Sequence, residues 1–188
     1  MKGKALVFSA PSGSGKTTIV RHLLNKFDNL GFSVSATTRK PRNNEVDGVD
    51  YHFLSKSDFL SRIDQGAFVE FEQVYEGLYY GTLKSEIDKC WANGIQVIFD
   101  VDVKGGLALK KYFGENCLAV FVKAPSIDVL RNRLKERNTD SKDIVEERIT
   151  KAEYEMSFEG QFDMSLVNDD LKEALHEIEI KVAEFLNN

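Results

Sequence analysis

Four short apolar runs, with helical patterns between and after them, predict the fold. The runs cover residues 4–10, 95–101, 118–122 and 164–167, and their length suits strands that are buried on both faces of a parallel sheet. Apolar residues at helical spacing follow the first run and close the chain; they are Ile19, Val20, Leu23, Leu24 and Phe27, then Leu171, Leu175, Ile178, Val182 and Phe185. This alternation predicts an α/β fold built on a doubly wound parallel sheet.

Two segments interrupt the alternation. Residues 32–88 are rich in β-branched and aromatic side chains separated by turn formers, which predicts a small mixed α/β lobe inserted into the sheet domain. Residues 126–160 show almost no strand pattern and predict a helical pair, which we name the lid. Because 188 residues suffice for one good core, we expect a single domain. Its core is then made of residues 1–31, 89–125 and 161–188.

Composition and charge limit the kinds of molecule that the protein is expected to bind and the compartment in which it is expected to occur. The net charge of −5 and the isoelectric point near 5.3 provide no overall attraction to nucleic acid or to anionic membranes. No stretch approaches the ~20 apolar residues of a membrane helix, and the N-terminal residues run into a strand pattern instead of a signal peptide. Cys90 and Cys117 have no metal-ligand spacing and indicate thiols in a reducing compartment. We expect a cytoplasmic protein, monomeric or weakly homo-oligomeric, that binds neither nucleic acid nor membrane.

The segment SAPSGSGKTT, residues 9–18, lies between the first strand and the first helix and has the pattern of a phosphate-binding loop. Small residues let backbone N–H groups turn inward around a triphosphate, and the helix presents its positive N-terminus. Lys16 would reach the β- and γ-phosphates, and the Thr17 hydroxyl would hold Mg²⁺. Ala10 replaces the usual first glycine, which the loop tolerates if φ is negative. The predicted ATP-binding residues here are Ala10, Pro11, Ser12, Gly13, Ser14, Gly15, Lys16, Thr17 and Thr18.

The run IQVIFDVD ends in Asp100 and Asp102. A carboxylate at the end of a parallel strand beside a phosphate loop is typical of a magnesium partner that acts through water. Solvated carboxylates at a strand end are the alternative for so common a pattern. The preceding loop favours the metal-side interpretation, so Thr17 and Asp100 are the predicted Mg²⁺ residues.

The predicted lobe carries a second polar set. Arg39 and Arg42 flank Pro41, and such a pair can clamp a phosphate bidentately while tyrosine hydroxyls donate to the same oxygens. A solvated charge pair is the ordinary alternative for two arginines at this spacing. It is disfavoured here because a serine, tyrosines and a carboxylate accompany the arginines; they are Ser35, Tyr51, Glu70 and Tyr80, with Thr82 nearby.

Taken in order, the motifs SAPSGSGKTT, SVSATTRKPR, DYHF, FVEFEQV, YYGT, IFDVD and LVNDD resemble those of the guanylate kinase family, and they span nearly the whole chain. The resemblance implies a guanine-reading set made of Ser35, Glu70, Thr82 and Asp102, with Asp100 also assigned to the GMP site. It implies that Arg39, Arg42, Tyr51 and Tyr80 hold the GMP phosphate. The chemistry agrees, because one carboxylate can accept both guanine N1–H and the 2-amino group, which adenine does not offer.

The helical pair resembles the lid of that family. The resemblance implies that Arg137 and Arg148 assist the transfer together with Lys16 and Arg42, and that Arg133 and Asn168 contact ATP. Solvated helix charges, and for Asn168 a cap of the last helix, are the ordinary alternatives. Two departures from the family pattern occur. Asn138 replaces a frequent glycine, and one extra residue between Glu70 and Tyr80 leaves Tyr79 as a competitor for the position of Tyr80.

The implied reaction is transfer of the γ-phosphoryl of Mg·ATP to GMP in purine nucleotide metabolism. No general base is required, because the second pKa of a phosphate monoester is about 6; His22, His52 and His176 are therefore expected to be structural or surface residues. The alternatives are another nucleoside monophosphate kinase, a silent guanylate-kinase-like module that binds proteins, and, more weakly, a nucleotide switch. Lys16, Thr17 and Asp100 favour an enzyme, since a silent module needs no intact phosphate loop.

Overall fold

The computed structural model describes residues 3–136 and 142–188, apart from the side chains of residues 142 and 143. Its larger sheet contains, in spatial order, β2 (Leu30–Phe32), β7 (Gln96–Asp100), β1 (Ala5–Ser9), β8 (Cys117–Lys123) and β9 (Met164–Val167). Strand β8 pairs in parallel with β1 and with β9. Every residue of β1 is buried, as expected for a strand covered on both faces. The four strands predicted from apolar runs are confirmed; three-residue β2 was not predicted, because it is too short to show a pattern.

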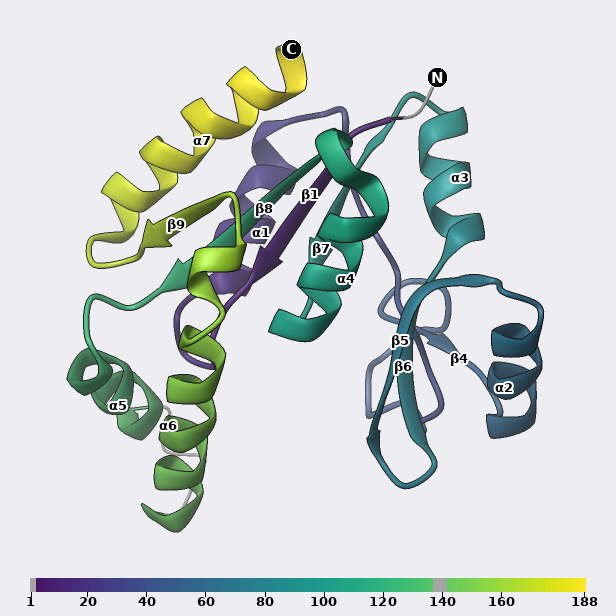
Figure 1. The fold of residues 1–188 in the computed structure, drawn as a ribbon, viewed down its shortest axis with the longest axis horizontal. Helices are drawn as coiled ribbons and strands as arrows, with labels where there is room; N and C mark the ends of the chain where they lie inside the picture. The colour runs from purple at the N-terminus through teal and green to yellow at the C-terminus, as the bar shows by residue number, and fades with distance from the viewer. Residues whose placement is uncertain (1–2, 137–141) are drawn as a thin grey trace. The chain divides into compact units, whose positions relative to one another are not determined.

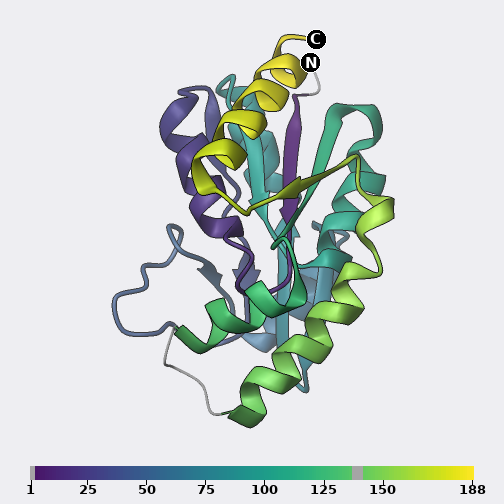
Figure 2. The same cartoon turned by 90° about the vertical axis from the view of Figure 1, so that its left-hand side faces the viewer.

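Three helices flank the strands β1, β8 and β9. Helix α1 (Lys16–Lys26) contacts β1 and α7 (Leu171–Asn187), whereas α4 (Val103–Phe113) packs against β1 and β8. Figure 2 shows α1 and α7 on one side of these strands and α4 on the other. The predicted doubly wound α/β architecture is confirmed. In this architecture the loop after β1, which carries the predicted phosphate-binding motif, leads directly into the N-terminus of α1.

A second sheet has the order β4 (His52–Phe53), β3 (Ala36–Thr37), β6 (Leu78–Leu83) and β5 (Phe68–Tyr75). Strand β6 runs antiparallel to β5 and to β3, and β3 pairs in parallel with β4. Helix α2 (Lys56–Asp64) contacts β6, and its Phe59 lies in a small core with Ala36, Phe68 and Leu83. Helix α3 (Lys84–Ala92) follows β6. The stretch from β3 to α3 thus mixes strands with helices, as the sequence predicts for an inserted lobe.

The segment after β8 is helical, as predicted. Helix α5 (Ile127–Glu136) and helix α6 (Lys142–Met156) share an apolar cluster. Its buried members are Ala124, Leu130, Leu134, Val145, Ile149 and Ala152. Figure 1 shows the two helices beside each other. Single turns of 3₁₀-helix occur at Gly114–Asn116 and Glu159–Gln161.

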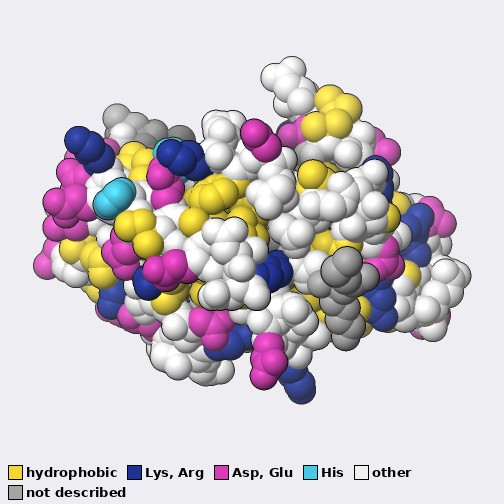
Figure 3. Space-filling model, turned by 90° about the horizontal axis from the view of Figure 1, so that it is seen from above, with side chains coloured by type: hydrophobic (Ala, Val, Ile, Leu, Met, Phe, Trp, Pro, Cys, Tyr) yellow, Lys and Arg dark blue, Asp and Glu magenta, His cyan; other side chains and the backbone are white. Residues whose placement is uncertain are grey.

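The chain forms two compact units. One contains Gly3 and residues 29–97, and the other contains residues 4–28 and 98–188, so the division passes through β7. The finer division into core, lobe and lid stays a prediction. None of the helices in residues 3–136 and 142–188 combines the length and apolar composition that a bilayer span requires. On the face shown in Figure 3, the Lys and Arg side chains of the described residues are interspersed with Asp and Glu.

Candidate functional site

The loop between β1 and α1 has the backbone that a phosphate cradle needs. Gly13 and Gly15 have φ of 95° and 90°, in the left-handed region that favours glycine, and Gly15 is the N-cap of α1. Ala10 is 8% exposed and keeps a negative φ, since Asn44 is the one non-glycine with positive φ among the described residues. The condition set for Ala10, a negative φ, is therefore met, and its tolerance by a phosphate-binding loop stays a prediction. Its methyl group is buried at the end of the strand.

The side chain of Asn168 is hydrogen-bonded to the backbone of this loop. Its side-chain Nδ2 donates to the Ser14 carbonyl oxygen at 2.8 Å, and the residue is 6% exposed. Its backbone N–H donates to the Lys123 carbonyl at 2.8 Å, which ties it to the end of β8. The alternative that Asn168 caps the last helix is wrong, because the N-cap of α7 is Asp170, whose carboxylate accepts from the Glu173 N–H at 3.0 Å.

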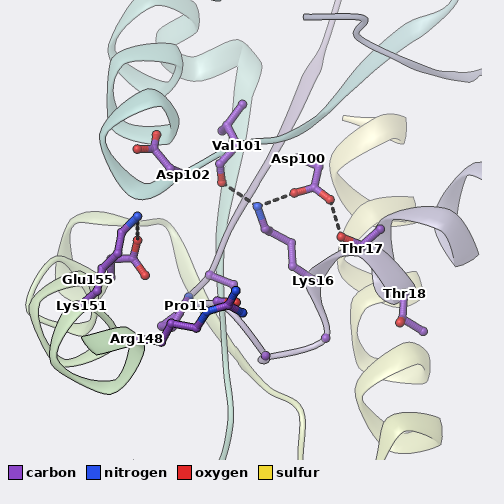
Figure 4. Close-up of a pocket in the computed structure, with 14 residues that line it drawn as sticks. Pro11, Lys16, Thr17, Thr18, Asp100, Val101, Asp102, Arg148, Lys151 and Glu155 are labelled. Carbon is purple, nitrogen blue, oxygen red and sulfur yellow. Dashed lines mark hydrogen bonds and ion pairs between the residues drawn. The ribbon is translucent and has the colours of Figure 1, made fainter. Parts of the chain in front are cut away.

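Lys16, Thr17 and Asp100 form one cluster (Figure 4). The Lys16 ammonium forms an ion pair with Asp100 Oδ1 and donates to the Val101 carbonyl oxygen at 2.8 Å. The Thr17 hydroxyl donates to Asp100 Oδ2 at 2.8 Å. β1 and β7 are neighbours in the sheet, which explains why residues far apart in sequence meet here. The Lys16 ammonium and the Thr17 hydroxyl of the loop therefore both contact the Asp100 carboxylate.

A pocket of about 380 Å³ opens at this cluster. Its lining consists of Ala10, Pro11, Ser12, Gly13, Gly15, Lys16, Thr17, Thr18, Asp100, Val101, Asp102, Arg148, Lys151 and Glu155. All predicted loop residues except Ser14 line it, and Ser14 is buried against Asn168. Asp102 also caps α4, where its Oδ1 accepts from the Gly105 N–H at 2.8 Å. Asp100 and Asp102 thus reach one pocket although only Asp100 contacts Lys16 and Thr17.

Helix α6 contributes three charged side chains to the pocket. Arg148 was predicted, whereas sequence reasoning missed Lys151 and Glu155. The Glu155 carboxylate lies 3.8 Å from the Lys151 ammonium, and burial raises the pKa of Glu155. The signal that could have found both residues is their spacing of three and seven from Arg148, which places all three on one helical face.

The other two predicted lid arginines are placed differently. Arg133 lies outside the lining of this pocket, and its Nη2 donates to the Asp169 carbonyl oxygen at 3.4 Å. Arg137, with the neighbouring departure Asn138, lies outside the described residues. The expected roles of these arginines stay predictions.

The donor set suits Mg²⁺. The Thr17 hydroxyl and the Asp100 carboxylate are hard oxygen ligands, and their 2.8 Å separation brings both to one point beside the phosphate loop. No group of three or more His, Cys, Asp or Glu that could hold a metal occurs among the described residues. Mg²⁺ ordinarily takes one or two protein oxygens plus phosphate and water, so this small donor set fits it.

Within residues 29–97, Arg39 lies among aromatic rings. Its guanidinium carbon is 4.8 Å from the centre of the Tyr51 ring, and the Tyr51 and Tyr80 rings meet edge-on at 6.0 Å. Glu45 and, to a lesser degree, Tyr80 raise the pKa of Arg39. Tyr79 instead packs on Phe59 at 5.4 Å, its hydroxyl donating to Gln73. The structure therefore brings Tyr80, and not Tyr79, to Arg39.

Strand register pairs two predicted guanine-reading residues. Glu70 on β5 lies opposite Thr82 on β6, and the Thr82 hydroxyl donates to Glu70 Oε1 at 2.6 Å. Thr82 is fully buried. Ser35 is half-buried, and its carbonyl accepts from the His52 N–H at 2.9 Å. Arg42 is exposed, and its backbone N–H donates to Glu45 at 2.7 Å. Sequence reasoning missed Glu45.

Comparison with known proteins gives a consistent result. The guanylate kinase family model matches residues 2–185. A guanylate kinase of Bacteroides thetaiotaomicron is 52% identical over 187 residues, covering 100% of this chain and 92% of the relative. One of Porphyromonas gingivalis is 46% identical, covering 97% of this chain and 98% of the relative. The crystal structure of guanylate kinase from Anaplasma phagocytophilum matches with a TM-score of 0.72 at 27% identity, covering 98% of this chain and 87% of that one.

Proposed function

Because the chain belongs to the guanylate kinase family, we propose that it transfers the γ-phosphoryl group of ATP to the phosphate of GMP, with ADP and GDP as products. The observation that carries this proposal is that Lys16 and Thr17 of the phosphate loop both contact Asp100. A silent binding module has no need of such a cluster. A nucleotide that must be neutralised and placed for transfer does need it.

The donor nucleotide binds at the phosphate loop. Backbone N–H groups of residues 10–18 and the N-terminus of α1 cradle the phosphates, and Lys16 leaves Asp100 to reach the β- and γ-oxygens. Thr17 would hold Mg²⁺ directly and Asp100 would hold it through water. When bound, Mg²⁺ neutralises charge on the transferred phosphoryl group. Asn168 and Arg133 contact the donor from the side of the loop formed by residues 167–170.

The acceptor binds in the lobe, residues 32–88. Arg39 and Arg42, with the hydroxyl groups of Tyr51 and Tyr80, hold its phosphate. Glu70 accepts from guanine N1–H and the 2-amino group. The remaining residues of the guanine set within the lobe are the hydroxyl residues Ser35 and Thr82. The assignments of Asp102 to guanine and of Asp100 to the GMP site stay predictions. Since Glu70 Oε1 already accepts from Thr82 at 2.6 Å, the carboxylate is oriented before guanine arrives.

The chemistry requires positioning and neutralisation rather than a base. The phosphate of GMP is largely ionised at pH 7, so its oxygen is a nucleophile without proton removal. Two polyanions must then approach in line, and the cations of Lys16, Arg42 and Arg148 lower their repulsion. Arg137, which lies outside the described residues, is assigned to the same task. The lid, residues 126–160, closes and excludes water from the transferred group.

The decisive experiment is a panel of GMP, AMP, UMP and CMP as acceptors with Mg·ATP, measured through ADP release. Of the four acceptors, we expect only GMP to be turned over rapidly. Glu70→Ala removes two hydrogen bonds to a charged acceptor, each contributing about 1.5–3 kcal/mol, so kcat/KM for GMP falls by about 10²–10⁴ while KM for ATP changes little.

Glu76→Ala is the matched control, because Glu76 is an exposed carboxylate in the turn between β5 and β6. It should leave both substrates unaffected. Equal losses for ATP and GMP in Glu70→Ala would contradict the guanine assignment. Absence of GMP-dependent ADP release in the unaltered protein would contradict the proposed function itself and favour a binding module.

A further inference from the structure

Glu45 is an anion built into the arginine cluster of the lobe. Its Oε2 accepts from Arg39 Nη1 at 2.5 Å and its Oε1 accepts from Arg39 Nη2 at 2.7 Å. Oε2 also accepts from the backbone N–H of Arg42 at 2.7 Å. One carboxylate therefore ties together the two arginines that flank Pro41.

The backbone of the loop is shaped to bring Glu45 there. The Glu45 N–H donates to the Arg42 carbonyl oxygen at 3.1 Å, which closes a four-residue turn. Asn44, the third residue of this turn, has a φ of 76°. A positive φ at that position is what a type II turn requires, and asparagine tolerates it better than most residues. The Glu45 side chain then folds back over the turn onto the Arg42 N–H.

Arg39 keeps one edge of its guanidinium for a further acceptor. Nη1 and Nη2 face Glu45, and Nη1 also donates to the Lys40 carbonyl oxygen at 3.1 Å. Nε is buried and has no hydrogen-bond partner among the described residues. The rings of Tyr51 and Phe53 lie 4.8 and 5.6 Å from the guanidinium carbon. A buried charged donor without an acceptor is costly, so this arrangement fits a guanidinium that receives a second anion on its Nε edge.

We propose that Glu45 is a positioning residue for the acceptor phosphate: it occupies the Nη1–Nη2 edge of Arg39 and so presents the Nε edge to GMP. This inference rests on the proposed function. Glu45 acts through Arg39 and does not touch the phosphate, because two anions repel. Hydrogen bonds from Arg39 and Arg42 lower the pKa of Glu45 to about 2, so the carboxylate stays charged throughout the pH range of a kinase assay.

The test compares Glu45→Gln with Glu76→Gln, which removes the same charge from an exposed position of the same unit. The glutamine amide turns a donor toward one Arg39 nitrogen and breaks the bidentate pair. We expect KM for GMP to rise roughly 10-fold or more, with KM for Mg·ATP unchanged and kcat altered less than about threefold. Binding of guanosine, which has no phosphate, should not change.

Two further variants test whether Glu45 affects GMP binding through Arg39. Arg39→Lys replaces the planar guanidinium with an ammonium that Glu45 cannot orient in the same way. Adding Glu45→Gln to this variant should therefore raise KM for GMP by less than about twofold. Glu45→Asp, which keeps the charge on a shorter side chain, should show the same selective loss for GMP as Glu45→Gln.

Two outcomes overturn the inference. A lower KM for GMP in Glu45→Gln would show that Glu45 competes with the phosphate for Arg39. Equal losses of GMP and guanosine binding would show that Glu45 only supports the lobe. An unaltered protein that does not use GMP would instead refute the proposed function, so the two failures are distinguishable.

Discussion

Gly15→Ala tests how the phosphate loop is held in shape. The φ of 90° at Gly15 costs a residue with a side chain about 1–2 kcal/mol. A methyl group at this position would also overlap Nδ2 of Asn168, which donates to the Ser14 carbonyl at 2.8 Å. Because Asn168 is 6% exposed, breaking that bond costs about 1–3 kcal/mol more. The two costs sum to roughly 2–5 kcal/mol.

Thermal unfolding followed by circular dichroism measures this loss. For a chain of this length each kcal/mol shifts Tm by about 2–4 °C, so Gly15→Ala should lower Tm by roughly 4–20 °C. The control is Gly94→Ala, where φ is 73° and no atom lies within 4 Å of the added methyl group. It should cost only the backbone strain, about 1–2 kcal/mol, or roughly 2–8 °C.

A double mutant separates the two costs of Gly15→Ala. In an Asn168→Ala background the methyl group has nothing to displace, so Gly15→Ala should then cost no more than Gly94→Ala. Equal Tm losses for Gly15→Ala and Gly94→Ala in the unaltered background would refute the reasoning, because they would show that the Asn168 contact contributes nothing.

Three further predictions follow from the site and the core. Arg148→Ala should lower kcat by about 10²–10³ while sparing GMP affinity, and normal turnover would contradict the lid role. Burial raises the pKa of Cys117 to about 12, so its alkylation at pH 8 should be about 10³ slower in the native protein than in urea, as peptide mass spectrometry will show. The pKa of Glu45 falls from 4.5 to about 2 on pairing with Arg39. That pair therefore stabilises the fold above pH 4.5 and is lost as pH falls toward 2, and the difference in urea midpoint between the unaltered protein and Glu45→Gln should shrink over that window.

Local patterns sufficed for much of the fold. Buried strands such as Ala5–Ser9 are continuous apolar runs, and the stripe of α7 recurs at helical spacing. The phosphate loop is equally local, because its glycines, Lys16 and Thr17 are contiguous. The motif order also sufficed for the family, which the comparisons confirm. Strand β2 escaped prediction because three residues carry no period.

Pairwise assignments within the site needed coordinates. Tyr79 and Tyr80 are adjacent, and the choice between them follows from which face of β6 packs on Phe59 and which meets Tyr51. The capping role considered for Asn168 belongs to Asp170, two residues later. Which residue takes each position depends on the alternation of side chains along a strand and on where a helix begins. A shift of one or two residues along the chain changes the assignment.

By itself, the sequence determined which chemical groups this protein possesses and the order of the longer strands and helices of the sheet domain, because backbone preference and apolar period are local properties. Only the tertiary structure decided which groups meet. Asp100 reaches Lys16 and Thr17 because β1 and β7 are neighbours in the sheet, and Glu70 reaches Thr82 through antiparallel register. Glu45 reaches Arg39 because a turn folds its side chain backward. Contacts of this kind depend on topology and side-chain direction, which no period along the chain encodes.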